Sequence, residues 1–397
     1  MFPLILFGAS VVPWETAGAG RALTHRGAPD SLPPVPHPRI PSNAAHLHAP
    51  DLSGARIAVV MMSAIGDAVH TLPVVNSLRA AAPDSRITWV IQPGPHGLVA
   101  GHPAVDEFVL FDRKRGWRAF RDVQRATAGE RFDLVIALQV YFKAGLVTRI
   151  LRSPRKLGFD RARARDANWL FTTERIAARG QRHVQDQYFE FLEHLGVPPL
   201  LEWRLGPTEE ERARYAGALP DDPRPTVAFV VGTSKPAKEW PAERYAVLAD
   251  RLAAAGVRTV LVGGRSPREL AAAEVIRRHA KHAPPDLLEW DLRKLVYLLD
   301  RVDVLVSPDT GPLHMGVALG TPTVSLMGFT NPKRVGPFRR FHDLMIDAYG
   351  DPGEDYPVSA EYRPGRMERI TPEEVAAKVE RALERYPRSS RSGISDR

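Results

Sequence analysis

The chain of 397 residues contains no cysteine. Disulfide bonds, thiolate metal sites and cysteine nucleophiles are therefore excluded. The chain also has no apolar run of about 18 residues, which is the length that a membrane-spanning helix needs, so we expect no such helix. What remains is an ordinary globular composition, with 44% hydrophobic and 25% charged residues. The length suggests two domains rather than one.

Several catalytic sequence patterns are absent as well. The chain has no P-loop, no His-Glu-x-x-His helix and no Gly-x-Ser-x-Gly turn, which argues against the chemistry that each of these motifs supports. Val262-Gly263-Gly264 is too short to be the Gly-x-Gly-x-x-Gly fingerprint of dinucleotide-binding proteins. An aspartate-rich Asp-x-Asp metal motif is also missing.

The N-terminal segment has the composition of a disordered extension. Its first residues, MFPLILFGAS, are apolar like part of a signal peptide, but they lack a basic region and the run is short. From about Pro13 to Pro50 the chain is rich in Pro, Gly, Ala and His and has no helical or strand periodicity. We predict disorder over residues 1–54. A start codon placed too early and a signal peptide are the alternatives.

The net charge of +8 is unevenly distributed. Between Arg113 and Arg182 there are 18 lysine and arginine residues against 6 aspartate and glutamate residues, an excess of 12. This stretch is either a solvated basic face or a surface that attracts a polyanion, such as phosphorylated lipid head groups or acidic sugars. No nucleic-acid partner is expected, because the stretch has no RNA- or DNA-binding signature and its aromatic residues are not interleaved with the basic ones.

Hydrophobic patterns predict two α/β halves. In the first half, apolar strands over 56–62, 87–91, 108–111 and 134–138 alternate with helices, which is typical of a parallel sheet covered on both faces. The Pro-rich segment Leu219–Pro225 separates this half from a second series of strands and helices that begins at Thr226. We predict domains over residues 55–220 and 221–370, a last helix over 371–386, and a disordered tail over 387–397.

The segment from Val306 to Pro337 carries the most specific pattern. An apolar strand ends in Ser307-Pro308-Asp309-Thr310-Gly311-Pro312, and a helix of small residues follows. Such a strand-to-helix turn opens at the carboxyl edge of an α/β sheet, where ligands bind. Its backbone N–H groups and helix N-terminus form a site for an anion or a phosphate.

Three segments resemble the motifs of glycosyltransferase family 9, the ADP-heptose:lipopolysaccharide heptosyltransferases. The donor-binding motif of that family is matched by Asp309, Thr310, Gly311, His314, Gly320, Pro322, Gly328, Thr330 and Pro332. A second signature is matched by Gly66, Asp67, Thr71 and Pro73, and a third by Lys238, Trp240 and Pro241. The resemblance extends over residues 56 to 385.

This resemblance implies a fold, an activity and a location. The fold is α/β, with two Rossmann-like domains facing each other across a cleft, the GT-B type. The resemblance also implies that the last helix, over 371–386, packs back on the first domain. The activity is an inverting transfer of heptose from ADP-heptose to the inner core of lipopolysaccharide, an acidic acceptor at the membrane surface. No cofactor is expected, because ADP-heptose is the donor substrate. The family also implies a cytoplasmic protein, peripheral at the inner face of the inner membrane.

Asp67 is the candidate general base. It follows the first strand, where Gly66 permits a tight turn. Its position alone favours a cap at the start of the next helix. The resemblance implies that this carboxylate takes the proton from the acceptor hydroxyl.

Lys238 is the candidate for stabilising the departing diphosphate. It lies in a loop with Thr233, Ser234 and Lys235 between a strand and a helix that Pro241 begins. Hydroxyls, backbone amides and an ammonium group at a helix start suit phosphate oxygens, although a solvated lysine is the alternative. Because the chain has no Asp-x-Asp motif to hold a metal ion, Lys238 and backbone dipoles would have to stabilise the negative charge of the leaving group. We therefore predict a metal-independent reaction.

The remaining candidates are expected to bind the donor. Asp309 either bonds sugar hydroxyls or caps the helix that follows it, and Thr310 and Gly311 bring backbone amides to the diphosphate. His314, on the first turn of that helix, is either a structural residue or a donor contact. Glu269 is assigned to the nucleoside ribose only by the resemblance, and a solvent-facing helix residue is the alternative.

Three other functions remain open at this point. The same fold can carry a different nucleotide-sugar or glycosylate a protein, although the iron-containing protein-glycosylating relatives use cysteines that this chain lacks. A non-catalytic nucleotide-sugar sensor would keep the donor cleft without a base. A nucleic-acid binder would depend on the basic stretch alone.

Overall fold

The computed structural model describes residues 52–388. The predicted disordered segments, residues 1–54 and 387–397, lie almost entirely outside this range. Within residues 52–388, no helix combines the length and the hydropathy needed to cross a bilayer.

The first half of the described chain is built on six parallel strands in the order β3-β2-β1-β4-β5-β6. The central strand β1 pairs with β2 on one side and β4 on the other, so that Val59 lies opposite both Trp89 and Ile136. From Ile57 to Val60 its sequence is continuously apolar because both faces of the sheet are covered. The strands are β1 (Arg56–Val60), β2 (Arg86–Ile91), β3 (Glu107–Leu110), β4 (Leu134–Ala137), β5 (Arg155–Gly158) and β6 (Glu174–Arg175).

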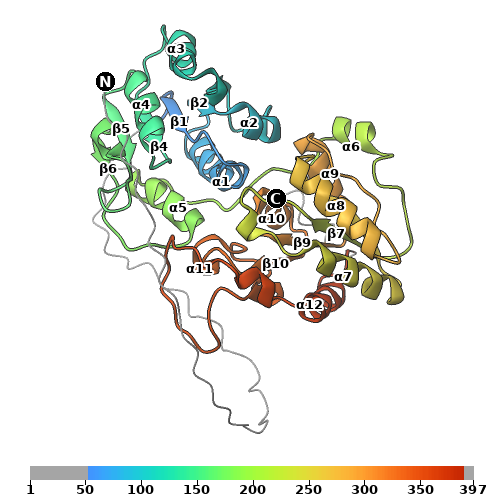
Figure 1. Cartoon of the computed structure of the whole chain (residues 1–397). Helices are drawn as coiled ribbons and strands as arrows, with labels where there is room; N and C mark the ends of the chain where they lie inside the picture. The colour runs from blue at the N-terminus through green and yellow to red at the C-terminus, as the bar shows by residue number, and fades with distance from the viewer. Residues whose placement is uncertain (1–51, 389–397) are drawn as a thin grey trace, which may run out of the picture. The chain divides into compact units, whose positions relative to one another are not determined.

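Helices cover the two faces of this sheet, as the alternation along β1 requires. Ile57 and Val59 belong to one core, whereas Ala58 and Val60 belong to another on the opposite face. The first core is shared with α1, α2 and α5, and the second with α3 and α4. The helices are α1 (Ile65–Ala81), α2 (Pro93–Val99), α3 (Trp117–Ala126), α4 (Phe142–Ile150) and α5 (Val184–His194), with short 3₁₀ turns η1 (Arg113–Arg115) and η2 (Asn168–Phe171) (Figure 1).

The second half contains a five-stranded parallel sheet in the order β11-β10-β9-β7-β8. Its strands are β7 (Thr226–Val230), β8 (Arg258–Val262), β9 (Val304–Pro308), β10 (Thr323–Met327) and β11 (Ile346–Asp347). Its helices are α6 (Glu209–Tyr215), α7 (Ala242–Ala254), α8 (Pro267–His279), α9 (Leu292–Arg301), α10 (Gly311–Leu319), α11 (Pro332–Val335) and α12 (Pro372–Arg385), with 3₁₀ turns η3 (Pro236–Lys238), η4 (His342–Leu344) and η5 (Arg366–Arg369). Helix α6 precedes the predicted boundary after residue 220 but packs on α9, so the second half includes it.

The last helix packs differently from the prediction. We expected the helix over 371–386 to return to the first domain, but α12 packs on α7, β9 and β10 of the second half (Figure 1). Its buried stripe of Val375, Ala376, Val379 and Ala382 joins the core on that face of the second sheet. The prediction is wrong because an amphipathic stripe shows that a helix is packed but not which sheet receives it.

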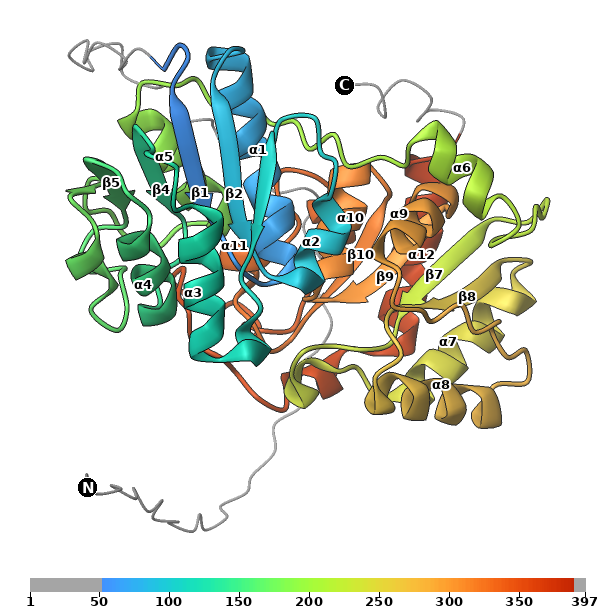
Figure 2. The same cartoon turned by 90° about the horizontal axis from the view of Figure 1, so that it is seen from above.

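The two halves meet where α1 contacts α10, and both views place α1 between the first sheet and α10 (Figure 2). Glycines permit this approach at the starts of the two helices. A Cβ on Gly311 would lie 2.7 Å from Cγ2 of Ile65, and a Cβ on Gly66 would lie 2.7 Å from the His314 ring. Arg293 adds a polar contact, since its guanidinium donates to the carbonyls of Leu98, Leu205 and Gly206. The loops that follow β1 and β9 are thereby held against each other.

Candidate active site

A pocket of about 530 Å³ lies where the carboxyl ends of the two sheets face each other. Strand order reverses between β1 and β4 in the first sheet and between β7 and β9 in the second, and ligands of open α/β sheets bind at such reversals. The loops after β1, β7 and β9 all contribute to the pocket wall. All nine residues singled out from the sequence line it, namely Asp67, Thr233, Ser234, Lys238, Glu269, Asp309, Thr310, Gly311 and His314.

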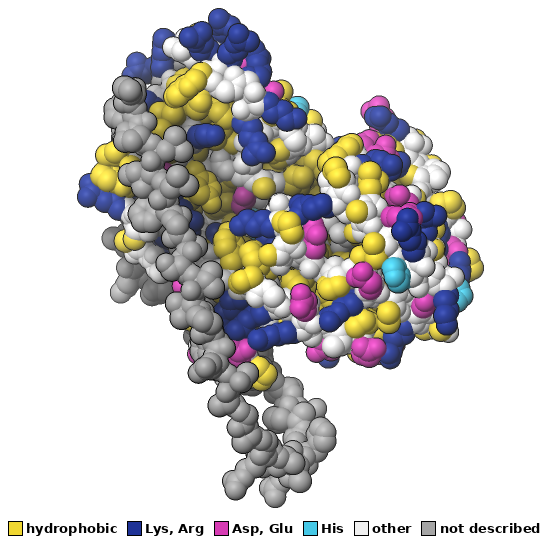
Figure 3. Space-filling model, in the orientation of Figure 1, with side chains coloured by type: hydrophobic (Ala, Val, Ile, Leu, Met, Phe, Trp, Pro, Cys, Tyr) yellow, Lys and Arg dark blue, Asp and Glu magenta, His cyan; other side chains and the backbone are white. Residues whose placement is uncertain are grey.

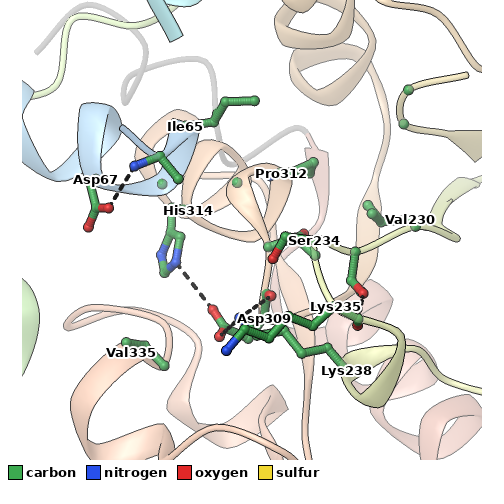
Figure 4. A pocket seen from close by; sticks show the side chains of 18 of the residues that line it. Ile65, Asp67, Val230, Ser234, Lys235, Lys238, Asp309, Pro312, His314 and Val335 are labelled. Atoms are coloured by element: carbon green, nitrogen blue, oxygen red, sulfur yellow. Dashed lines mark hydrogen bonds and ion pairs between the residues drawn. The ribbon is translucent and has the colours of Figure 1, made fainter. Parts of the chain in front are cut away.

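Asp67 forms the wall on the side of the first half (Figure 4). Its Oδ2 accepts a hydrogen bond from the backbone N–H of Ala64 at 2.7 Å, so the carboxylate does cap the start of α1. Its Oδ1 accepts a hydrogen bond from the Tyr188 hydroxyl at 3.2 Å. Capping and pocket lining are therefore compatible in one side chain.

The environment of Asp67 also changes its acidity. Burial raises the pKa of this carboxyl above its ordinary value, and the hydrogen bonds from Ala64 and Tyr188 oppose that rise only in part. A raised pKa makes the carboxylate a stronger base than an exposed aspartate.

Lys238 and Asp309 form a mostly buried ion pair on the opposite wall. Lys238 Nζ lies 2.6 Å from Asp309 Oδ2, and the two side chains are 15% and 10% exposed. Thr330 Oγ1 donates to the same carboxylate oxygen at 2.8 Å, and His314 Nε2 lies 3.6 Å from Oδ1. Figure 4 shows His314 between Asp67 and Asp309.

These contacts hold Asp309 ionised. Burial alone would raise its pKa, but the interactions with His314 and Lys238 outweigh burial and hold the pKa of Asp309 below its ordinary value. Because Asp309 stays charged, it fixes the ammonium group of Lys238 at the pocket wall rather than in solvent.

Thr310 and Gly311 begin α10 at the same wall. The side chain of Thr310, the N-cap residue, does not cap this helix start, because it accepts no hydrogen bond from the first turn. The first amides of a helix have no partners within the helix, and the helix dipole makes this end positive. The N-terminus of α10 is therefore an available site for an anionic group in the pocket.

Thr233, Ser234 and Glu269 form the far end of the pocket, toward β8. Thr233 Oγ1 donates to the carbonyl of Lys235 at 2.5 Å, which tightens the loop after β7. The Glu269 carboxylate accepts from the backbone N–H groups of Gly264 at 2.7 Å and Ser266 at 2.9 Å. Glu269 is thus oriented at the start of α8 and faces the pocket, rather than being a free solvent-facing residue.

Sequence reasoning missed two residues that bear on this site. Tyr188 comes from α5, 121 positions from Asp67, and no local pattern connects them. Arg334 lines the pocket, and its side chain has no ion pair or hydrogen bond among residues 52–388. Its position in Asn331-Pro332-Lys333-Arg334, within a motif already noted, could have marked it as a candidate cation.

Comparison with protein families gives an independent view of this fold. The family model for glycosyltransferase family 9 (heptosyltransferase) matches residues 120–348. Lipopolysaccharide heptosyltransferase 1 of Pseudomonas aeruginosa is 30% identical over 297 residues, which cover 72% of this chain and 82% of that protein. The lipopolysaccharide core heptosyltransferase OpsX of Haemophilus influenzae is 28% identical over 295 residues, covering 74% of this chain and 84% of that protein.

Solved structures agree with the fold. A glycosyl transferase family 9 protein from Veillonella parvula superposes with a TM-score of 0.73 at 26% identity, covering 85% of this chain and 99% of that one. The E. coli heptosyltransferase WaaC with ADP gives a TM-score of 0.67 at 24% identity, covering 82% and 99%. The predicted fold, two Rossmann-like domains of the GT-B type, is confirmed. The chain belongs to glycosyltransferase family 9, the heptosyltransferases of lipopolysaccharide core synthesis.

Proposed function

We propose that this glycosyltransferase transfers a heptose from ADP-heptose to the inner core of lipopolysaccharide, with inversion at the anomeric carbon. The observation that carries the proposal is that Asp67 of the first half and Lys238, Thr310 and Gly311 of the second half line one pocket. The carboxylate on one wall can accept the proton of an acceptor hydroxyl. The cation and the free helix amides on the other wall can bind a diphosphate. The names of the relatives support the choice of substrates.

In the proposed reaction, the Asp67 carboxylate takes the proton of the acceptor hydroxyl. The acceptor oxygen forms a bond to the anomeric carbon of the heptose, and the bond between that carbon and the diphosphate oxygen breaks. The electron pair of the broken bond stays on ADP. Lys238 and the amides at the start of α10 stabilise the charge that develops there, and enclosure in the pocket limits hydrolysis of the donor.

We assign the other residues to donor and acceptor positioning. Asp309 holds Lys238 in place and offers its carboxylate to donor hydroxyls, and His314 supports Asp309 from the first turn of α10. Thr233, Ser234 and Glu269 bind the nucleoside end of the donor. The unpaired guanidinium of Arg334 suits a carboxylate or phosphate of the acceptor, because it lines the pocket and is close enough to Asp67 for its charge to oppose the rise in the pKa of that residue.

The test is a panel of nucleotide-sugars incubated with truncated lipopolysaccharides, with the product mass as the readout. We expect a gain of one heptose residue from ADP-heptose only. A gain in product mass from another nucleotide-sugar would show that the enzyme uses a different donor. Donor binding without any product would instead identify a non-catalytic nucleotide-sugar-binding protein.

Tyr188→Phe should shift the acid limb of the pH–rate profile to higher pH. The Tyr188 hydroxyl stabilises the charged form of Asp67, so its loss should raise the pKa of the base further. A base is active only when deprotonated, so the rate falls as pH drops through its pKa. The rate at alkaline pH should change little. If the acid limb of the variant lies at the same pH as that of the wild-type enzyme, Tyr188 does not influence the pKa of the base.

Chelation should leave turnover unchanged. The proposed reaction places the leaving-group charge on Lys238 and backbone amides, and the sequence has no Asp-x-Asp motif. Rates measured in EDTA should match those in Mg²⁺ within about twofold, since a metal ion that stabilised the diphosphate would contribute several kcal/mol. Activity lost in EDTA and restored by Mg²⁺ or Mn²⁺ would overturn the metal-independent assignment.

A further inference from the structure

Exposed large hydrophobic side chains are concentrated in one part of the first half. Among residues 52–388, nine such side chains are exposed, and five of them lie between positions 110 and 170. Trp117 is 76% exposed and Leu170 is 62% exposed. The five are Leu110, Trp117, Tyr141, Phe142 and Leu170. Of the other four, Trp290 and Tyr362 line the pocket, whereas Val247 and Leu270 stand on α7 and α8.

The fold brings these five residues to the edge of the first sheet that faces the pocket. Leu110 ends β3, Trp117 begins α3, and Tyr141 and Phe142 begin α4 directly after β4. Because all six strands are parallel, the segments that follow them emerge at the same edge, where Asp67 follows β1. Leu170 is in η2, which packs on α4, and the rings of Phe142 and Phe171 are 5.4 Å apart.

Cations surround these side chains. Arg113, Lys114, Arg118, Arg121, Lys143 and Arg165 are all exposed, and none of them has an ion pair within the described part of the chain. Arg115 pairs with Asp122 at 2.9 Å, and the Arg161 guanidinium lies 4.2 Å above the Trp169 ring. Figure 3 shows Lys and Arg side chains crowded over α3, beside hydrophobic side chains.

We propose that this basic aromatic surface, made of the five hydrophobic residues and the six unpaired cations, docks on the surface of an anionic lipid bilayer. Exposed tryptophan, tyrosine and phenylalanine side chains fit the boundary between head groups and acyl chains. Cations next to them fit the negative potential of an anionic leaflet. A free sugar phosphate would use the cations but would leave the indole of Trp117 in water.

The position of the surface favours a bilayer over a nucleic acid. The hydrophobic residues are exposed on separate elements, β3, α3, α4 and η2, and include two leucines, which do not form a stacking platform for bases. Docking by this surface would bring the pocket edge that carries Asp67 toward the membrane. A lipid-linked acceptor would then reach the base without leaving the bilayer, a consequence that rests on the proposed function.

The test is co-sedimentation of the full-length protein with vesicles, without donor or acceptor. We expect binding to vesicles of phosphatidylcholine mixed with phosphatidylglycerol, weak binding to pure phosphatidylcholine, and a decrease with rising salt. Trp117→Ser combined with Phe142→Ser should lower the partition coefficient by about tenfold or more, because each ring loses apolar contact with the bilayer. Arg118→Gln combined with Arg121→Gln should lower it by about 25-fold, at roughly fivefold per cation.

Matched variants on the second half serve as controls. Val247→Ser removes an exposed hydrophobic residue on α7, and Arg251→Gln with Lys281→Gln removes two exposed charges. These variants should bind vesicles like the wild-type protein. Equal binding to neutral and anionic vesicles would overturn the proposal. The same holds if the control variants lose as much vesicle binding as the surface variants, or if the Trp117 and Phe142 variant binds vesicles like the wild-type protein.

Turnover separates this inference from the proposed function. With a water-soluble acceptor, the Trp117 and Phe142 variant should keep wild-type activity, whereas activity on acceptor embedded in anionic vesicles should fall with vesicle binding. Because the vesicle measurement needs no sugar donor, failure to dock and failure to transfer heptose are distinguishable results. An electrophoretic shift of RNA that persists at physiological salt, without vesicle binding, would assign the surface to nucleic acid instead.

Discussion

Asp67→Asn is expected to lower turnover by about 10²- to 10⁴-fold, the usual contribution of a general base. Asparagine keeps the shape of the side chain, and its amide oxygen can still accept the hydrogen bond from Ala64. It cannot accept the proton of the acceptor hydroxyl. The loss should therefore appear in kcat, while the KM for the donor should change little because the donor is assigned to the other wall of the pocket.

Glu374→Gln is the matched control for the capping role. Glu374 occupies the third position of α12 and accepts from the backbone N–H of Thr371 at 2.9 Å, as Asp67 does from Ala64 in α1. It lies outside the pocket. If the two substitutions reduced turnover equally, or if Asp67→Asn kept a near-wild-type rate, the base would have to be another group.

Lys238→Met is expected to lower kcat by about 10²- to 10³-fold, because it removes a preorganised cation from the site where leaving-group charge develops. It should also lower the stability of the protein. Removing one partner of a buried ion pair leaves an uncompensated charge, here on Asp309, at a cost of about 3–5 kcal/mol. Both effects can be measured on the same sample, by steady-state kinetics and thermal unfolding.

The double variant Lys238→Met/Asp309→Asn separates these two effects. It removes both charges of the pair, so stability should recover relative to Lys238→Met while activity stays low. Lys333→Met is the control, because it breaks a lysine–aspartate contact of 2.9 Å with Asp355 outside the pocket, where exposed pairs contribute little. Activity that recovers together with stability in the double variant would show that Lys238 acts only through folding.

Much of the fold could be predicted because the relevant signals are local. Continuous apolar runs such as β1 and β9 mark strands that are buried on both faces, and the alternation with helices marks a parallel sheet. The start of α9 also has a local origin, since the Asp291 side chain accepts hydrogen bonds from the amides of Arg293 and Lys294. The partner of α12 could not be predicted, because helix amphipathicity contains no information about which of two similar sheets it covers.

The site was predictable in its components but not in its connections. Asp67, Lys238 and Asp309 each follow a strand, and carboxyl ends of strands are where α/β sheets bind ligands. The ion pair between Lys238 and Asp309 joins loops 71 positions apart, and the hydrogen bond from Tyr188 to Asp67 comes from a separate helix. Such contacts depend on how the two sheets pack against each other, and the spacing of residues in the sequence does not predict that packing.

The most direct test of the division between the two walls is calorimetric titration of ADP into the wild-type protein, Asp67→Asn and Lys238→Met. The account predicts that Asp67→Asn binds ADP with wild-type affinity although its turnover is strongly lowered. It also predicts that Lys238→Met binds ADP about tenfold more weakly or worse, as expected for a lost charge-assisted contact. Loss of ADP affinity in Asp67→Asn, or wild-type affinity in Lys238→Met, would contradict the assignment of base and diphosphate site to opposite walls.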